Sequence, residues 1–325
     1  VFFAESGSVS VEIAMKMALQ FWINRGVAGR TRFLAFSGGY HGDTLATMTV
    51  CDPEEGMHSL FAGVLPDQVI AGLPLDPRSE AALDAVLATH AGQIAAILVE
   101  PLVQGAGGML FHQAEVLRRL RALADRHNVL LIFDEIFTGF GRTGTLFAME
   151  AAGIEPDIVT VSKALTGGTL PLSAAVASRR VFEAFWSDDP GAALMHGPTY
   201  MANPLACAAA NASLDLFERG DWSVDVARVS AGLAEGLEPC RQMTSVVDVR
   251  VLGAIGVVEF AQAVDVGSLC AAFADEGVWI RPMGKVVYAT PALVICDNDL
   301  ARLTDAFRKV LGQERPRPPT SRNVG

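Results

Sequence analysis

The sequence predicts an α/β protein, with a large domain built on a mostly parallel, doubly wound sheet and a smaller C-terminal α+β domain. Over most of the chain, short apolar runs rich in β-branched residues alternate with stretches of helical spacing, which is typical of a doubly wound sheet. From about Asp221 the order changes to helix, two strands, helix, strand and helix. We therefore expect a large domain over residues 1–217, a small domain over residues 218–312 and a disordered, proline-rich tail over residues 313–325.

The strands expected in the large domain are short apolar runs bounded by turn or charged residues, as buried parallel strands are. They are Val1–Ala4, Arg32–Phe36, Ile94–Val99, Val129–Phe133, Ile158–Val161 and Ser173–Ser178. The expected helices have apolar residues at helical spacing, and Ser79, with Glu80 in the first turn, is expected to cap one of them. They are Val9–Trp22, Ser79–Ala91, Ala114–His127 and Asn203–Glu218. A loop-rich stretch is expected between Cys51 and Arg78.

The small domain is expected to mix helices and strands. Its predicted helices are 221–237, Ser268–Glu276 and Asp299–Leu311. Its predicted strands are Val246–Leu252, Ile255–Phe260 and Val278–Arg281.

The composition excludes several classes of protein. A chain of 325 residues that is 51% hydrophobic can bury a large core, yet it contains no apolar run of membrane-spanning length. Its net charge of -11 argues against nucleic acid or an anionic membrane as a partner. The five cysteines form no CxxC pair, which favours a reducing cytoplasm, and the scattered histidines predict no metal site.

Charged residues follow two neighbouring strands of the predicted sheet. Asp134 comes directly after Val129–Phe133, and Lys163 follows Ile158–Val161. Ligands bind at this carboxyl edge of open α/β sheets. Pyridoxal phosphate requires both groups, since it takes a Schiff-base lysine and an acidic partner for its ring nitrogen.

Each of these two residues also has a simpler interpretation. Of the four lysines in the chain, only Lys163 sits at a strand end, flanked by small residues, but a surface lysine in a loop would look the same. A Schiff-base lysine is expected to be packed and partly desolvated, so that its amine is neutral. A strand-end aspartate such as Asp134 is often only a cap, and Glu100 and Glu135 either orient a pocket or are merely solvated.

Two further segments fit a phosphorylated, flat ligand. Gly7 and Ser8 precede a helix, and the free N–H groups and the dipole at a helix start favour a phosphate. Tyr40 follows a strand and offers an aromatic face for stacking, although an ordinary buried tyrosine is the alternative. The glycines from Gly139 to Gly144 match GxGxxG, but the acidic residue that a dinucleotide fold places after the next strand is missing.

Several motifs together resemble one family, the class III pyridoxal-phosphate aminotransferases. The motifs are DEIFTGFGRTG at 134–144, PDI at 156–158 and SKALTGG at 162–168. Others resemble the branch of that family that carries an amino group from S-adenosylmethionine to 8-amino-7-oxononanoate in biotin synthesis. These are SGSV at 6–9, YHGDT at 40–44, MHGPT at 195–199, NPLAC at 203–207 and WIRP at 279–282.

The resemblance implies a fold type I enzyme, acting as a homodimer, and assigns roles by position. Lys163 would bind pyridoxal phosphate covalently and shuttle the proton, Asp134 would pair with the ring nitrogen, and Tyr40 would stack on the ring. Gly7 and Ser8 would hold the phosphate together with Thr199 from the second subunit. The residues implied for the substrates are Arg281, which would bind the keto substrate's carboxylate, and Gly197, Tyr288, Arg142 and Asp43.

The implied reaction is a ping-pong transamination that yields 7,8-diaminononanoate. One alternative is another class III enzyme, which would act on ω-amino acids with pyruvate or 2-oxoglutarate. A second is an isomerase on the same fold. A third is an inactive fragment or binding protein, because the chain starts at Val1 without a methionine and we expect the family's N-terminal segment to be absent.

Overall fold

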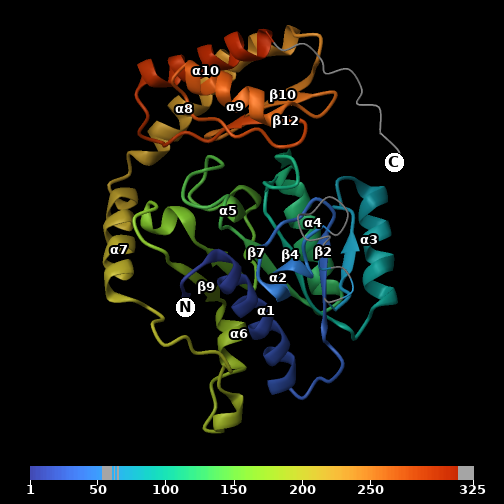
Figure 1. Cartoon of the computed structure of the whole chain (residues 1–325). Coiled ribbons are helices and arrows are strands. Elements are labelled where there is room, and N and C mark those ends of the chain that lie inside the picture. Colours follow the sequence, from blue (N-terminus) through green and yellow to red (C-terminus); the bar gives the residue numbers. More distant parts are fainter. Residues whose placement is uncertain (53–60, 62, 64–65, 314–325) are drawn as a thin grey trace. The chain divides into compact units, whose positions relative to one another are not determined.

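The structure, a computed structural model, describes residues 1–52, 61, 63 and 66–313 (Figure 1). The chain divides into two compact units. Unit 1 comprises Val1–Phe140 and Thr145–Arg219, and unit 2 comprises Gly141–Gly144 and Gly220–Gly325.

Unit 1 is built on a seven-stranded sheet in the order β1-β9-β8-β7-β4-β2-β3. The strands are β1 (Phe2–Ala4), β2 (Arg32–Phe36), β3 (Val69–Ala71), β4 (Ile94–Val99), β7 (Leu130–Asp134), β8 (Ile158–Val161) and β9 (Ser173–Ala177). The pairs from β3 to β8 are all parallel, and only β9 runs antiparallel to both of its neighbours. The predicted α/β class with a mostly parallel sheet is confirmed. A separate hairpin joins β5 (Val103–Gln104) to β6 (Leu110–Phe111).

Helices cover both faces of this sheet. The helices of unit 1 are α1 (Gly7–Asn24), α2 (Leu45–Met48), α3 (Pro77–Thr89), α4 (Ala114–Arg126), α5 (Ala148–Ala152), α6 (Arg179–Glu183) and α7 (Pro204–Glu218). In Figure 1, α1 lies in front of the strands, and its buried side chains share a core with Leu130 and Ile132 of β7. Because successive side chains of a strand point to opposite faces, Leu131 and Phe133 point the other way, and α4 packs against β7.

Unit 2 has a three-stranded antiparallel sheet and its own core. The strands are β10 (Val246–Leu252), β11 (Ile255–Phe260) and β12 (Val286–Ala289), and the helices are α8 (Trp222–Leu237), α9 (Val266–Asp275) and α10 (Asp297–Gly312). Phe273 of α9 and Phe307 of α10 are fully buried, with ring centres 5.1 Å apart.

One predicted strand and one predicted helix cap differ from the structure. The predicted strand Val278–Arg281 is wrong, since this segment is irregular and the third strand is β12; Pro282 has no N–H to donate to a ladder at that point. The cap of α3 is Asp76 rather than Ser79, which instead completes a capping box with it. The predicted tail lies outside the described residues apart from Gln313, and part of the predicted loop 51–78 lies outside them as well.

No helix in the described part of the chain combines the length and the apolar character needed to cross a bilayer.

Candidate active site

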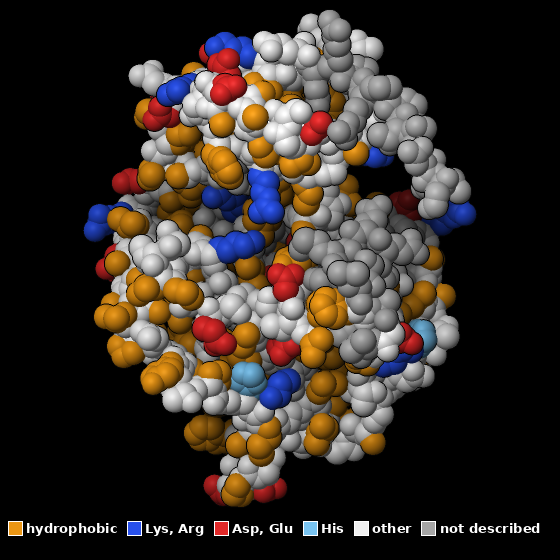
Figure 2. Space-filling view, viewed as in Figure 1, with side chains coloured by type: hydrophobic (Ala, Val, Ile, Leu, Met, Phe, Trp, Pro, Cys, Tyr) orange, Lys and Arg blue, Asp and Glu red, His pale blue; other side chains and the backbone are white. Residues whose placement is uncertain are grey.

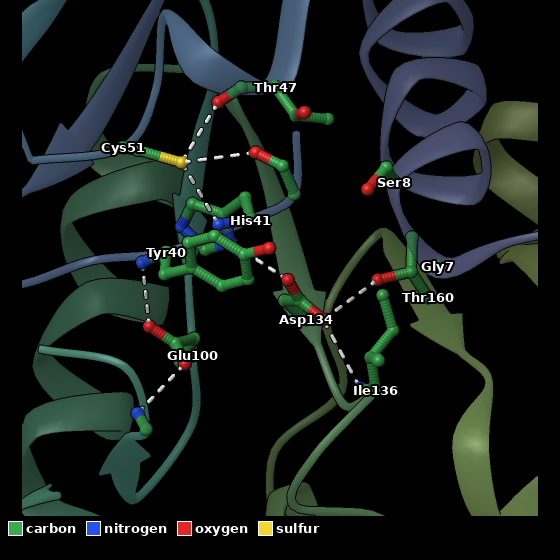
Figure 3. Close-up of polar contacts among 12 residues, drawn as sticks. Gly7, Ser8, Tyr40, His41, Thr47, Cys51, Glu100, Asp134, Ile136 and Thr160 are labelled. Atoms are coloured by element: carbon green, nitrogen blue, oxygen red, sulfur yellow. Dashed lines mark hydrogen bonds and ion pairs between the residues drawn. The ribbon is translucent and has the colours of Figure 1, made fainter. Parts of the chain in front are cut away.

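Asp134, the last residue of β7, is the best-defined polar group at the carboxyl edge of the sheet (Figure 3). Its side chain is buried, with a residue exposure of only 4%. Oδ1 accepts hydrogen bonds from the Ile136 amide at 3.1 Å and the Thr160 hydroxyl at 3.4 Å, and Oδ2 lies 2.8 Å from Nδ1 of His41. A buried carboxylate needs such partners, so its position and direction are fixed.

His41 is in turn held by Cys51. The His41 amide donates to Cys51 Sγ at 3.2 Å, and the thiol donates to the Thr47 carbonyl at 3.2 Å. Burial raises the pKa of the Cys51 thiol to about 12, so it remains neutral and acts as a fixed hydrogen-bonding group rather than a nucleophile. No role was predicted for His41, although it directly follows Tyr40 and precedes a glycine in the sequence.

Tyr40 is positioned through its backbone. Its amide donates to Oε2 of the buried Glu100 at 3.0 Å, and the Gly105 amide donates to Oε1 at 3.0 Å. Burial raises the pKa of Glu100 to about 7. Burial, followed by a hydrogen bond with Asp43, also raises the pKa of the Tyr40 phenol, which therefore stays protonated. Glu100 thus orients the pocket and is not simply solvated.

Unlike its neighbour Asp134, Glu135 contacts the start of helix α5. It is fully buried and accepts hydrogen bonds from the Ala148 and Met149 amides, at 2.9 and 3.0 Å, and from the Thr138 hydroxyl at 3.1 Å. The two amides open α5, so Glu135 caps that helix. Burial raises its pKa to about 7.

Gly7 and Ser8 form the first turn of α1, directly beside the loop that carries Tyr40. The Ser8 hydroxyl accepts from the Asp43 amide at 3.1 Å. A Cβ added to Gly42, whose φ is +129°, would lie 2.2 Å from Ser8 Oγ, so only glycine allows this approach. The first amides of a helix have no acceptor within it, and this first turn contains no acidic residue, so an anion fits here.

Lys163 follows β8, the strand beside β7, and Asp134 pairs with Thr160 across the two. The lysine opens a 3₁₀ turn (Lys163–Thr166) and has a left-handed φ of +43°, which is rare for a residue with a side chain. Its Nζ lies 5.1 Å from the centre of the Phe137 ring. We expected a packed amine, but in the structure the Lys163 side chain is exposed.

The remaining predicted residues are divided between the units. Gly197 and Thr199 lie exposed in unit 1, in the segment between α6 and α7. Arg142, Arg281 and Tyr288 belong to unit 2. Arg142 is inserted there as part of the glycine loop, and its Nη1 donates to the carbonyls of Ala254 and Pro291 at 3.0 and 2.8 Å. Burial lowers the pKa of its guanidinium.

Unit 1 therefore gathers a buried acid, an aromatic ring, a helix N-terminus and a strand-end lysine at one edge of its sheet. The family model for class III aminotransferases matches residues 1–311 of this chain. The chain belongs to the class III aminotransferase family. This confirms the resemblance inferred from the sequence motifs.

Two enzymes that carry the same name are similar to this chain over almost its full length. The adenosylmethionine-8-amino-7-oxononanoate aminotransferase of Mycobacterium leprae is 49% identical over 96% of this chain and 72% of its own length. The enzyme of the same name from Corynebacterium glutamicum is 47% identical over 94% of this chain and 74% of its own.

Solved structures agree with the sequence relatives. The adenosylmethionine-8-amino-7-oxononanoate aminotransferase of Methanocaldococcus jannaschii superimposes with a TM-score of 0.90 at 29% identity, covering 96% of this chain and 74% of that one. A PLP-bound amine transaminase from an uncultivated Pseudomonas species superimposes with a TM-score of 0.87 at 32% identity, covering 96% of this chain and 76% of that one.

Proposed function

We propose that this chain is a pyridoxal-phosphate enzyme that transfers the α-amino group of S-adenosylmethionine to the ketone of 8-amino-7-oxononanoate, in the cytoplasm, by a ping-pong reaction. The observation that carries the substrate assignment is the identity of 49% and 47% to two enzymes named for this reaction. The neighbouring strand ends at Asp134 and Lys163 support the cofactor.

The residues of unit 1 fit the cofactor. Pyridoxal phosphate, when bound, supplies a reactive carbonyl and an electron-withdrawing ring. The Gly7 and Ser8 amides at the start of α1 would bind its phosphate. The Tyr40 face would lie on the ring, and the buried Asp134 would hold a proton on the ring nitrogen, with His41 fixing the carboxylate.

Lys163 would bind the cofactor carbon through Nζ and, once released, move the proton between the substrate and the cofactor. Lys163 follows β8 beside the β7 end that carries Asp134, and its side chain is exposed. Asp134 and Lys163 would thus have separate roles: Asp134 would hold the proton at the ring nitrogen, and Lys163 Nζ would act as the general base and acid toward the substrate.

The proposal also assigns five residues to substrate binding. Arg281 would bind the keto substrate's carboxylate with its planar fork, while Gly197, Tyr288 and Asp43 would line the pocket. Arg142 would also line it, but because its Nη1 already bonds to two carbonyls, only Nε and Nη2 would serve a substrate.

A homodimer, with Thr199 of each copy completing the phosphate site of the other, is part of this proposal. Exposed apolar side chains precede and follow Thr199 in the sequence, as expected for a surface that a second copy covers. They include Trp186 (78%), Met195 (58%), Tyr200 (83%) and Leu205 (71%). Apolar side chains are also visible at the surface of unit 1 in Figure 2.

The alternative is an amine or ω-amino acid transaminase. It is favoured by structural relatives such as the Pseudomonas amine transaminase, but at 32% identity rather than 49%. The two differ in amino donor. Protein loaded with pyridoxal phosphate should lose its yellow colour on addition of S-adenosylmethionine and then form 7,8-diaminononanoate from 8-amino-7-oxononanoate. Transfer from alanine but not from S-adenosylmethionine would establish the alternative.

A further inference from the structure

One flank of α1 carries three polar side chains that no step above uses: Lys16, Gln20 and Asn24. They are four residues apart, so they lie in one row along the helix. All three contact the backbone of the segment that leads from α6 to Thr199. We call this row the α1 ladder.

The central member of the ladder, Gln20, makes the most contacts. Its Nε2 donates to the Ala193 carbonyl at 2.6 Å and to the Ala192 carbonyl at 3.3 Å. Its Oε1 accepts from the Met195 amide at 3.1 Å. The Gln20 side chain therefore bonds to both C=O and N–H groups of the segment. These bonds fix the orientation of the segment and its distance from α1.

The two outer members bind the ends of the same stretch. Asn24 Nδ2 donates to the carbonyls of Ala184 and Ala192 at 3.1 and 2.9 Å. Lys16 Nζ donates to the Met195 carbonyl and lies 3.2 Å from Nδ1 of His196. Burial, and then the charge of Lys16, lower the pKa of His196, so its ring is neutral and Nδ1 can accept from the ammonium group.

Besides the α1 ladder, the segment has apolar contacts, since Leu194 packs against the core of unit 1 and the His196 ring lies 5.9 Å from that of Phe2. Its regular structure is limited to a short 3₁₀ turn at Pro190–Ala192, and its backbone hydrogen bonds are local, such as Ala192 to Asp189 and His196 to Leu194. In the part of the chain that the structure describes, the hydrogen bonds that tie residues 192–196 to more distant elements come from the α1 ladder.

We propose that Lys16, Gln20 and Asn24 are positioning residues, which hold the segment 192–199 in the conformation that delivers Thr199 to the phosphate site of a second copy. This inference rests on the proposed function, specifically on the dimer. It makes α1 serve two sites: its first turn binds the phosphate of its own site, and its flank prepares the segment for the other. Loss of the α1 ladder in one copy then weakens cofactor binding at the site of the other copy.

The test uses mixed dimers in which only one site can bind the cofactor covalently. In the first, a Lys163→Ala, Gln20→Met chain pairs with a wild-type chain, so the competent site receives Thr199 from a chain without the central ladder residue. In the second, a Lys163→Ala chain pairs with a Gln20→Met chain, so the competent site receives Thr199 from an intact ladder. Methionine matches glutamine in length but forms neither kind of hydrogen bond.

The expected result is an asymmetric loss. The dissociation constant of pyridoxal phosphate should rise about tenfold in the first dimer, equivalent to about 1.4 kcal/mol, and stay near the wild-type value in the second. Hydrogen exchange at the Met195 amide should be faster in every Gln20→Met chain. This measurement does not depend on enzyme activity. Gln93→Met, at an exposed glutamine elsewhere in unit 1, should change neither quantity.

Two results would overturn the inference: equal cofactor affinity in the two dimers, or unchanged exchange at Met195. The same pair of dimers made with Thr199→Ala in place of Gln20→Met separates this failure from that of the proposed function. If Thr199→Ala weakens binding only from the opposite chain while Gln20→Met does not, the ladder proposal alone is wrong. If Thr199→Ala has no effect from the opposite chain, the shared phosphate site itself is wrong.

Discussion

Replacing Glu100 by glutamine should make the protein less stable than the wild type at acidic pH and more stable than the wild type at basic pH. Burial raises the pKa of Glu100 from its usual 4.5 to about 7, a difference of about 2.5 pH units. Below pH 4.5 the group is protonated in both the folded and the unfolded chain and contributes nothing. Between pH 4.5 and 7 only the folded chain keeps the proton, so the free energy of unfolding falls as the pH rises.

The size of this term follows from the pKa difference. At 1.36 kcal/mol for each pH unit, ionisation of Glu100 lowers the free energy of unfolding by about 3 kcal/mol once the pH exceeds 7. Glutamine is neutral throughout, so it avoids this loss. Its single carbonyl oxygen can, however, accept from only one of the Tyr40 and Gly105 amides, which costs about 1–2 kcal/mol at every pH.

The two terms predict a crossing of the stability curves. Glu100→Gln should be less stable than the wild type by about 1–2 kcal/mol at pH 4 and more stable by about 1–2 kcal/mol at pH 8. Urea denaturation at several pH values measures this difference, and Glu135 cancels because it is present in both proteins. Glu155→Gln, which changes an exposed glutamate, should show no crossing. A constant difference between Glu100→Gln and the wild type from pH 4 to 8 would refute the reasoning.

The other predictions concern the cofactor and the keto substrate. Asp134→Asn keeps the shape but loses the charge opposite the ring nitrogen, so amino transfer should slow by about 10²–10³ in single-turnover assays; an unchanged rate would remove Asp134 from the chemistry. Gly42→Ala places a Cβ 2.2 Å from Ser8 Oγ and should weaken cofactor binding at least about a hundredfold by titration, as a loss of roughly 3 kcal/mol. Gly26→Ala, with a similarly positive φ but no atom within 4 Å of the added Cβ, should only lower the melting temperature. Arg281→Lys should raise KM for 8-amino-7-oxononanoate about tenfold and leave the reaction with S-adenosylmethionine unchanged; equal effects on both would contradict the assignment.

Strands β2, β4, β7 and β8 of the central sheet were predictable because each is a short apolar run that is largely buried. Strand β3 (Val69–Ala71) was missed, because it lies in the stretch that was expected to be loop-rich. β2, β4 and β8 have the predicted bounds, and so do β10 and β11 in unit 2. The failure at Val278–Arg281 is instructive, since Trp279 is 81% exposed and Ile280 buried, an alternation like that of a strand. This alternation did not distinguish a strand from an irregular segment, and Pro282, which has no N–H to donate, directly follows it.

The candidate site was predictable only where a residue's place at a strand end or helix start defines it. Asp134, Lys163, Gly7 and Ser8 meet that condition, although their roles stay predictions. The contact of His41 with Asp134 joins residues that are distant in sequence, and no local pattern encodes it. The α1 ladder likewise depends on a contact between α1 and residues about 170 positions later in the chain.

The central claim is that Lys163 binds the cofactor, and borohydride reduction tests it most directly. Reduction of the yellow protein fixes the cofactor to its lysine, and peptide mapping by mass spectrometry then identifies which of the four lysines carries it. We predict modification at Lys163, with none in a Lys163→Ala variant and none after prior addition of S-adenosylmethionine. Stoichiometric modification at Lys16, Lys285 or Lys309, or in the Lys163→Ala variant, would contradict the account.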